Sequence, residues 1–427
     1  MTQVPVGSLH CQKDTYCKEF YSTCLSCTEK PDKKGFYQVK LIDTILFPEG
    51  GGQPSDEGYF NDTIKVYKVE RKLLEHIHYT KEPVQVNSEV KITLDWERRW
   101  DHVQQHSGQH LVSAILEQPD PNSQEHLETV GWCMKEKVSY IELDTSSRKN
   151  QAVLTRDFLN QKEKEMNDFI IKAIPITCHT DAVEEGENRP TNLPDDYQGE
   201  QAILRTIEIQ GIDKNPCCGT HVAHLGHLQS IKLLQTESIR GGNTRLYFIV
   251  GQRCIDTLND LFLTSRELNK LLSVPTHEFT ESVERLQSQL KQQLKLVKKW
   301  QTQTAQAIIK DIEHQLWVEK KNKIVILDES ETGGGDMTYL NLIAALIKEK
   351  DWLNQLEHPV VIVLASGDKQ KGGILLVLSN QDATLKSFTT SLTSIMVGTK
   401  GGGARGRWSG KSTNFTNIDQ LNDIKVE

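Results

Sequence analysis

The densest chemical signal in the sequence is a pair of histidines, His106 and His110, in the segment HSGQH (residues 106–110). On a helix, residues four apart lie on one face, about one turn from each other. Two imidazoles placed in this way suit two bonds of about 2.0–2.1 Å to a single Zn²⁺ ion. His102 also stands four residues before His106, so spacing alone does not decide which pair would bind a metal.

A second pair of metal-binding side chains lies more than a hundred residues later, in the segment CCGTH (residues 217–221). Cys217 and His221 are again four residues apart, within a turn that contains a glycine. One thiolate and three imidazoles form a ligand set typical of zinc, so the two segments together predict one Zn²⁺ ion per chain. The spacing favours Cys217 over Cys218 as the metal ligand. Cys218 is then expected to be a buried structural thiol.

Other kinds of zinc protein fit this pattern less well. Metalloproteases of the H-E-x-x-H type have a glutamate general base after the first histidine, where this chain has Ser107. A zinc finger is not expected, because whole elements of secondary structure separate the two pairs of metal-binding side chains. The pair Cys24 and Cys27 has metal-like spacing but lacks a second local pair. A structural zinc stays open, because four protein ligands close a tetrahedral site and catalysis would need one to loosen or the coordination to expand.

The first element expected to support the ligands is a β domain in residues 1–95. Alternating or β-rich segments predict a barrel or sandwich with strands at 36–42, 65–69 and 90–94. Between two of these strands, the segment FPEGGGQP (residues 47–54) contains three successive glycines. Glycines permit backbone conformations closed to other residues and close approach of a ligand, although a flexible hairpin loop is an equal alternative.

Residues 96–253 predict an α+β zinc-binding domain. Asp95 is a suitable N-cap for a helix from Trp96 to Leu116, which would carry the first histidine pair. Further elements are expected as strands at 139–143, 202–209, 229–234 and 245–250, and as a helix near 151–171. The acidic, turn-rich segment 181–199 predicts a mobile loop.

Residues 254–320 predict a long helical connector. Apolar side chains recur at a spacing of three or four from Val283 to Ala307, with an interruption at Gln293, which indicates a long helix or a short coiled coil. An arm between two lobes is favoured over a dimer zipper. The lysine cluster of this connector is predicted to be a solvent-exposed face rather than an RNA-binding site. It consists of Lys291, Lys295, Lys298 and Lys299.

Residues 321–427 predict a small C-terminal α/β domain, so the whole chain is expected to be an α+β multidomain protein. Strands are expected at 323–327, 360–365 and 374–378, and helices at 339–347 and 383–396. The tail at 398–411 is rich in glycine and positive charge, and Trp408 is expected to be available for stacking on a nucleic-acid base.

The bulk composition is that of an ordinary globular chain, with 427 residues, 37% apolar residues and 25% charged residues. The net charge of −8 argues against a large non-specific phosphate footprint, although a local basic surface remains compatible with it. Nine cysteines, an odd number, do not suggest a disulfide scaffold. The longest apolar runs, such as 360–365, are far short of the roughly 20 residues that span a bilayer, so no membrane partner and a cytoplasmic location are expected.

Three segments taken together resemble the editing region of alanyl-tRNA synthetases: FPEGGGQP (47–54), the run from DWERR to HSGQH (95–110), and NPCCGTHV (215–222). The glycine-rich tail near 398–412 resembles the terminal domain of the same enzymes. The chain is similar to the long, eukaryotic form of the free-standing alanyl-tRNA editing proteins of the AlaX type, with the motifs in the family's order. The chain begins directly at the β domain, without room for an ATP-using synthetase core, so the resemblance implies editing in trans.

The resemblance implies that zinc is held by His106, His110, Cys217 and His221, and that the reaction is hydrolysis of Ser-tRNA(Ala), with Gly-tRNA(Ala) as a second candidate. As hypotheses, Gly51, Gly52 and Gln53 contact the substrate, while Gln109 and Thr220 form catalytic, supporting or substrate hydrogen bonds. The tRNA phosphates would be bound by Lys400, Arg405, Arg407 and Lys411. Residues 126–138 match no motif of the family, and the sequence does not indicate an oligomeric state. The alternative function is an inactive zinc-containing adaptor that binds tRNA or protein.

Overall fold

The computed structural model describes residues 2–118, 127–146, 154–182, 202–329 and 335–426. The chain forms two compact units, residues 1–267 and 268–427. Most of the predicted mobile loop at 181–199 lies outside the described residues. The overall α+β, multidomain character is confirmed, whereas the finer division into four domains stays a prediction.

The N-terminal part of the first unit is a closed six-stranded barrel with the strand order β1-β2-β5-β4-β3-β6. The predicted barrel is thus confirmed, and closure occurs where β6 pairs with both β1 and β3. Alternate side chains of the strands point inward and are fully buried, among them Leu41, Val66 and Ile92. A short helix, α1 (His10–Lys13), precedes the strands, which are β1 (Glu19–Cys27), β2 (Tyr37–Leu41), β3 (Gly58–Phe60), β4 (Ile64–Lys72), β5 (Glu75–Thr80) and β6 (Glu89–Leu94).

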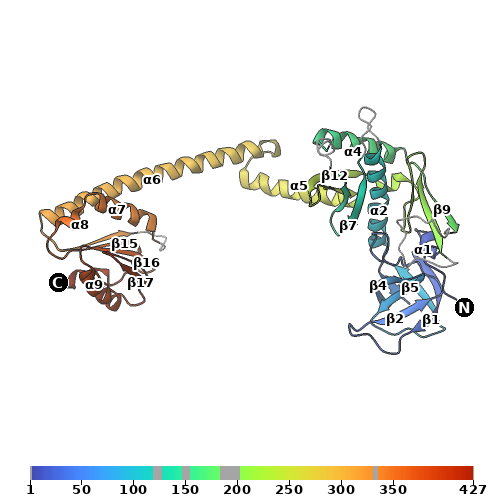
Figure 1. Ribbon diagram of the computed structural model, residues 1–427, viewed down its shortest axis with the longest axis horizontal. Coiled ribbons are helices and arrows are strands. Elements are labelled where there is room, and N and C mark those ends of the chain that lie inside the picture. Colours follow the sequence, from blue (N-terminus) through green and yellow to red (C-terminus); the bar gives the residue numbers. More distant parts are fainter. Residues whose placement is uncertain (1, 119–126, 147–153, 183–201, 330–334, 427) are drawn as a thin grey trace. The chain divides into compact units, whose positions relative to one another are not determined.

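Helix α2 (Trp96–Glu117) leaves the barrel and carries the first histidine pair. Its predicted N-cap is confirmed, because the Asp95 side chain accepts a hydrogen bond from the backbone N–H of Arg98. Arg99 is fully buried and pairs with the equally buried Asp56 of the barrel, with Nε of Arg99 2.9 Å from Oδ2 of Asp56. This ion pair fixes the start of α2 against the barrel, and Figure 1 shows the helix running from the barrel toward the next sheets.

The rest of the first unit contains two antiparallel sheets and helix α4 (Arg156–Ile171). The core packs α2 side chains such as Leu111 and Ile115 against Leu246 and Phe248. The predicted strands and the helix are present. Three further strands, β7, β9 and β11, were not predicted from the sequence. One sheet has the order β12-β13-β8-β7, with β7 (Thr129–Met134), β8 (Ser139–Leu143), β12 (Ile231–Ser238) and β13 (Thr244–Val250); the other has the order β11-β10-β9, with β9 (Ile176–Ala182), β10 (Ile203–Ile209) and β11 (Asp213–Pro216).

The predicted helical connector consists of two helices, α5 (Gln252–Leu272) and α6 (Phe279–Trp317). The chain breaks between them because Ser273 adopts a left-handed conformation with φ of 55° and Pro275 follows it. Apart from Ser282 near its start, the buried residues of α6 lie in its last part, where Ile309 and Ile312 join the core beneath helix α7 (Met337–Glu349). The lysines of the predicted solvated face are exposed, as expected.

The second unit is built on a five-stranded sheet with the order β14-β15-β16-β18-β17. Figure 1 shows α7 and α8 (Trp352–Gln355) on one face of this sheet and α9 (Asp382–Ile395) on the other. The strands β15 (Val361–Asp368) and β16 (Gly372–Ser379) are buried on both faces, which explains their unbroken apolar runs. The predicted elements are present, including β14 (Lys323–Glu329), and the glycine-rich tail adds a hairpin of β17 (Lys400–Ala404) and β18 (Arg407–Ser412).

Candidate metal centre

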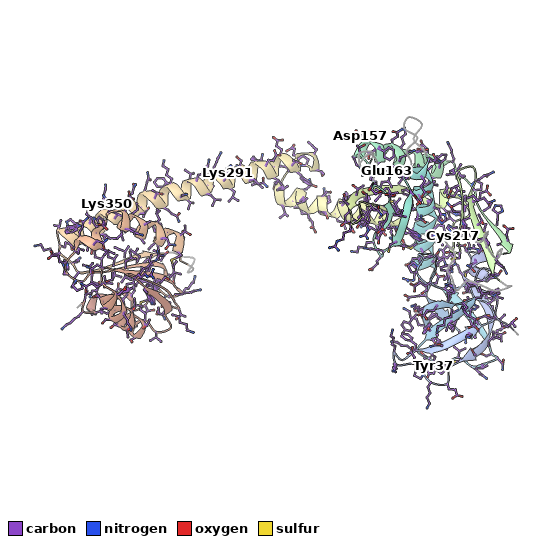
Figure 2. All side chains as sticks on the ribbon, in the orientation of Figure 1. Tyr37, Asp157, Glu163, Cys217, Lys291 and Lys350 are labelled. Carbon is purple, nitrogen blue, oxygen red and sulfur yellow. The ribbon has the colours of Figure 1, made fainter. Side chains whose placement is uncertain are left out.

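Four side chains from two distant segments converge in the first unit, and they are His106, His110, Cys217 and His221. One ligand atom from each lies within 4.8 Å of every other one. Helix α2 supplies two imidazoles one turn apart, and the turn after β11 supplies the thiol and the third imidazole. In Figure 2, Cys217 lies between the barrel, marked by Tyr37, and helix α4, marked by Asp157 and Glu163.

The distances within this cluster suit a tetrahedral metal ion. Sγ of Cys217 lies 3.3 Å from Nε2 of His106 and 3.3 Å from Nε2 of His221. Zinc bonds of the usual lengths at tetrahedral angles place nitrogen and sulfur ligands roughly 3.5 Å apart. The residues present therefore form a buried His and Cys cluster that could hold a metal ion, with soft and borderline donors of the kind zinc prefers.

Burial sets the protonation of the cluster. It lowers the pKa of His110 to about 4 and holds the pKa of His106 and of His221 well below the ordinary value. All three imidazoles are therefore neutral at pH 7, which is the state that binds a metal. The same burial raises the pKa of the Cys217 thiol to about 12, so binding of a metal would have to displace its proton.

Gln53 fixes the orientation of the His106 imidazole. Oε1 of Gln53 accepts one hydrogen bond from the backbone N–H of Thr220 at 3.0 Å and lies 2.9 Å from Nδ1 of His106. Because an amide oxygen only accepts, Nδ1 of His106 carries the proton and Nε2 presents its lone pair toward Cys217. Nε2 of Gln53 donates to Oγ1 of Thr220 at 2.8 Å. The sequence suggested a substrate contact for Gln53, but its side chain is fully buried against His106 and Thr220.

Two residues that the sequence analysis did not single out hold the other half of the cluster. Oγ of Ser107 lies 3.2 Å from Nδ1 of His221 and accepts a hydrogen bond from the backbone N–H of Val222. The buried Arg205 guanidinium donates to the carbonyl oxygens of Cys217 and Gly219, at 3.2 and 2.8 Å. Its positive charge also favours the thiolate of Cys217, against the larger effect of burial. No local spacing marks Arg205, because it contacts the turn only across the hairpin.

The cluster opens into a cavity of about 640 Å³. Three of the ligands line it, together with Gly51, Gln109 and Trp132. Gly52 has φ of 80°, and a Cβ atom there would lie 2.4 Å from the indole of Trp132. The three-glycine loop thus packs closely against Trp132, whose ring centroid is 4.9 Å from that of His106. Trp132 lies in the segment that matched no motif, so nothing in the sequence pointed to it.

The chain is similar in sequence to proteins of known families. Residues 204–247 match a family model described as the threonyl and alanyl tRNA synthetase second additional domain. Alanyl-tRNA editing protein Aarsd1-A of Xenopus laevis is 33% identical over 421 residues, which cover 96% of this chain and 95% of the relative. The putative alanyl-tRNA editing protein alaX of Saccharomyces cerevisiae is 32% identical, covering 98% and 96% of the two chains.

This chain belongs to the alanyl-tRNA editing protein family. The predicted resemblance is thereby confirmed. A further member, alanyl-tRNA editing protein AlaX-L of Pyrococcus horikoshii, is 29% identical over 259 residues, or 58% of this chain and 59% of that protein. Among the residues that the structure describes, no helix is both long enough and apolar enough to span a bilayer.

The structure also shows where the other candidate site residues of the first unit lie. His102 does not join the cluster, although it lies one turn before His106 on the same helix. Gln109 lines the cavity, where its Nε2 donates to Oγ of Ser113 at 3.0 Å, and Thr129 donates to the same oxygen at 3.0 Å. Thr220 is fully buried and bonded to Gln53, so it supports the ligand His106 through that residue.

The predicted tRNA-binding residues all belong to the hairpin of the second unit. Lys400 pairs with Lys411 across β17 and β18, and the turn contains Arg405, while Arg407 donates to Asn341 at 2.6 Å. All four basic side chains are exposed. The expectation for Trp408 is wrong, because this ring is only 7% exposed and packs in the core against α9. Its position inside a strand, with alternate residues facing inward, buries it.

Proposed function

We propose that this protein is a zinc-dependent aminoacyl-tRNA deacylase that hydrolyses the ester of mischarged Ser-tRNA(Ala), with Gly-tRNA(Ala) as a second substrate. The names of the relatives support editing of alanyl-tRNA as the broader activity. The observation that carries the zinc-dependent reaction is the convergence of three imidazoles and one thiol at the wall of a cavity. A purely structural zinc would have no need of such a cavity.

An editing activity is needed because binding alone discriminates poorly between alanine and amino acids of similar size. A pocket built for alanine rejects the smaller glycine poorly, and it rejects serine poorly because an added hydroxyl costs little. A second site that binds the serine hydroxyl can spare Ala-tRNA(Ala), because the alanine methyl would leave the polar groups of that site unpaired, whereas glycine leaves room for a water molecule that pairs with them. The connected side chains of Gln109, Ser113 and Thr129 supply such polar groups on the cavity wall. We assign to them the recognition of the serine hydroxyl.

The protein residues would act mainly by holding and orienting. The ligand set would be His106, His110, Cys217 and His221, and a bound zinc ion would polarise the ester carbonyl, supply hydroxide or orient the amino acid. Gln53 and Ser107 would keep the imidazoles of His106 and His221 turned toward the centre. Arg205 would hold the turn at Cys217 in place and favour its thiolate. The exposed cations of the β17–β18 hairpin would bind tRNA phosphates.

Deacylation of Ser-tRNA(Ala) beside Ala-tRNA(Ala), with and without a chelator, tests this function. We expect hydrolysis of the seryl ester only, and its loss on removal of the metal. Cys217→Ala should lower both bound zinc and deacylation, whereas Cys218→Ala is the matched control for bound zinc, because Cys218 lines the cavity but is outside the ligand cluster. Unchanged deacylation by a folded, zinc-free protein would exclude a required metal. Binding of tRNA without hydrolysis at any enzyme concentration would instead support the inactive adaptor.

A further inference from the structure

A second cavity, of about 430 Å³, lies in the first unit and shares no lining residue with the cavity at the metal centre. Its wall is formed by the start of α2, the turn of the β7–β8 hairpin and the start of α5. The wall contains three cationic side chains and two carboxylates besides a histidine. The polar lining residues are Arg98, Asp101, His102, Lys135, Glu136 and Arg253.

Arg253 is held rigidly in this wall. Its Nε and Nη2 atoms donate to Oδ1 and Oδ2 of Asp101, both at 2.7 Å. This bidentate pair uses Nε and Nη2 on one edge of the guanidinium, so Nη1 takes no part in it. Arg253 is 8% exposed, and Nη1 is buried without a hydrogen-bond partner in the described part of the protein.

His102 is the second residue of the wall with an unused polar atom. It is 6% exposed, and its Nδ1 atom is buried without a partner among the described residues. A buried polar group that stays unpaired is destabilising, and more so when it is charged. Two such groups in the wall of one cavity therefore indicate a site for a ligand that offers acceptor oxygens. The lining contains three cations, Arg98, Lys135 and Arg253, and two carboxylates, Asp101 and Glu136, while Arg98 also lies 3.9 Å from Glu57 outside the lining. The unused Nη1 donor of Arg253 carries positive charge and therefore favours an anionic ligand.

The position of the cavity relative to the metal centre narrows the choice of anion. His102 lies one turn before His106 on the same face of α2, so the two Cα atoms are roughly 6 Å apart along the helix. Pro54 of the lining directly follows Gln53, which supports the metal ligand His106. An RNA whose 3′-terminal ester reaches the metal centre must have its last phosphates within a short distance of that ester.

We propose that this cavity is a phosphate-binding site for the single-stranded 3′ end of the tRNA. Arg253 and His102 bind one phosphodiester there, Asp101 holds Arg253 in position, and Arg98 and Lys135 supply the surrounding positive charge. This inference rests on the proposed function for the position of the RNA. It adds a contact that places the terminal ester at the metal, separate from the basic hairpin of the second unit.

Binding of uncharged tRNA(Ala) to the full chain tests the site without requiring turnover. One RNA has the mature 3′ end, and the other lacks its last three nucleotides. Arg253→Lys keeps a charge for Asp101 but replaces three nitrogens by one, so no further nitrogen is left for the phosphate, and His102→Phe keeps a ring but removes both nitrogens. Arg245→Lys is the matched control, because Arg245 pairs with Glu142 outside this cavity. Thermal unfolding of each variant confirms that the protein is folded.

We expect each of the two cavity variants to weaken binding of the mature tRNA about tenfold, as for loss of a charge-assisted hydrogen bond. Neither should change binding of the shortened tRNA, and the control should change neither RNA. Equal losses for both RNAs, or no loss for either, would overturn the proposal. Binding of inorganic phosphate that the variants abolish, with tRNA affinity unchanged, would show a free-phosphate site and overturn it as well. Failure of the wild type to hydrolyse Ser-tRNA(Ala), with these binding differences intact, would count against the proposed function alone.

Discussion

Nδ1 of His106 and Oε1 of Gln53 are 2.9 Å apart and join helix α2 to the glycine loop of the barrel, 53 residues earlier in the chain. The contact selects one tautomer of His106, with Nε2 directed toward Cys217. Hydrogen bonds of this kind to metal ligands are worth 10- to 100-fold in metal affinity or activity. The geometry of the candidate metal centre therefore depends on a residue outside the two segments that supply the His and Cys side chains.

Replacing Gln53 by Ala should weaken zinc binding by about 10- to 100-fold, because His106 and the N–H of Thr220 both lose their acceptor. Titration of the zinc-loaded protein with a chelator measures the affinity. Gln38→Ala, in strand β2 of the barrel, is a control that should leave it unchanged. An unaltered zinc affinity in Gln53→Ala would show that His106 does not need this orientation.

Replacing Gly52 by Ala should impair both folding and deacylation. The new Cβ would lie 2.4 Å from the Trp132 indole, and φ of 80° is unfavourable for alanine. We expect a loss of about 1–3 kcal/mol in the free energy of unfolding and at least a tenfold loss of deacylation, because Trp132 lines the cavity. Gly50→Ala is the control, since its Cβ would meet only a carbonyl oxygen at 3.9 Å. Equal effects of the two substitutions would refute a specific role for the contact with Trp132.

Replacing Arg99 by Ala should lower the free energy of unfolding of the first unit by about 3–5 kcal/mol. The substitution leaves the fully buried Asp56 carboxylate without its partner, which costs far more than the loss of an exposed pair. Denaturant unfolding measures the change. Lys65→Ala removes an exposed pair with Glu57 and should cost no more than about 1 kcal/mol. Similar costs for both variants would contradict the anchoring of α2 by Arg99.

Acid should destabilise the barrel through His78. This imidazole is fully buried, and burial lowers its pKa to about 4, whereas an unfolded histidine has a pKa near 6.5. Between these values the unfolded chain binds a proton that the folded protein does not bind. The contribution of His78 to stability is therefore complete above pH 6.5 and is lost as the pH falls toward 4.

The variant His78→Gln removes this titration. Between pH 7.5 and pH 5, the free energy of unfolding of the wild type should fall by about 2 kcal/mol more than that of the variant. Denaturant unfolding at the two pH values gives both differences. His277→Gln is the control, because the side chain of His277 is 80% exposed and should not alter the pH dependence. A parallel fall in the wild type and His78→Gln would disprove this role.

Local features of this protein could be predicted from the order of its residues. Period-two segments marked barrel strands, Asp95 marked the start of α2, and the spacing of four marked Cys217 with His221 but left His106 with either His102 or His110. These features depend on contacts between residues close in the chain, so their pattern survives in one dimension. The strands β9 and β11 escaped notice because pairing with β10, rather than their own composition, makes them strands.

Which side chains meet depends on the three-dimensional fold. It brought His110 rather than His102 to Cys217, turned Gln53 toward His106, and placed Arg205 over the turn at 217–219. These contacts join segments separated by up to about a hundred residues, and no local spacing encodes them. Burial is set in the same way, which is why Trp408 lies in a core when its glycine-rich, basic surroundings suggested an exposed ring.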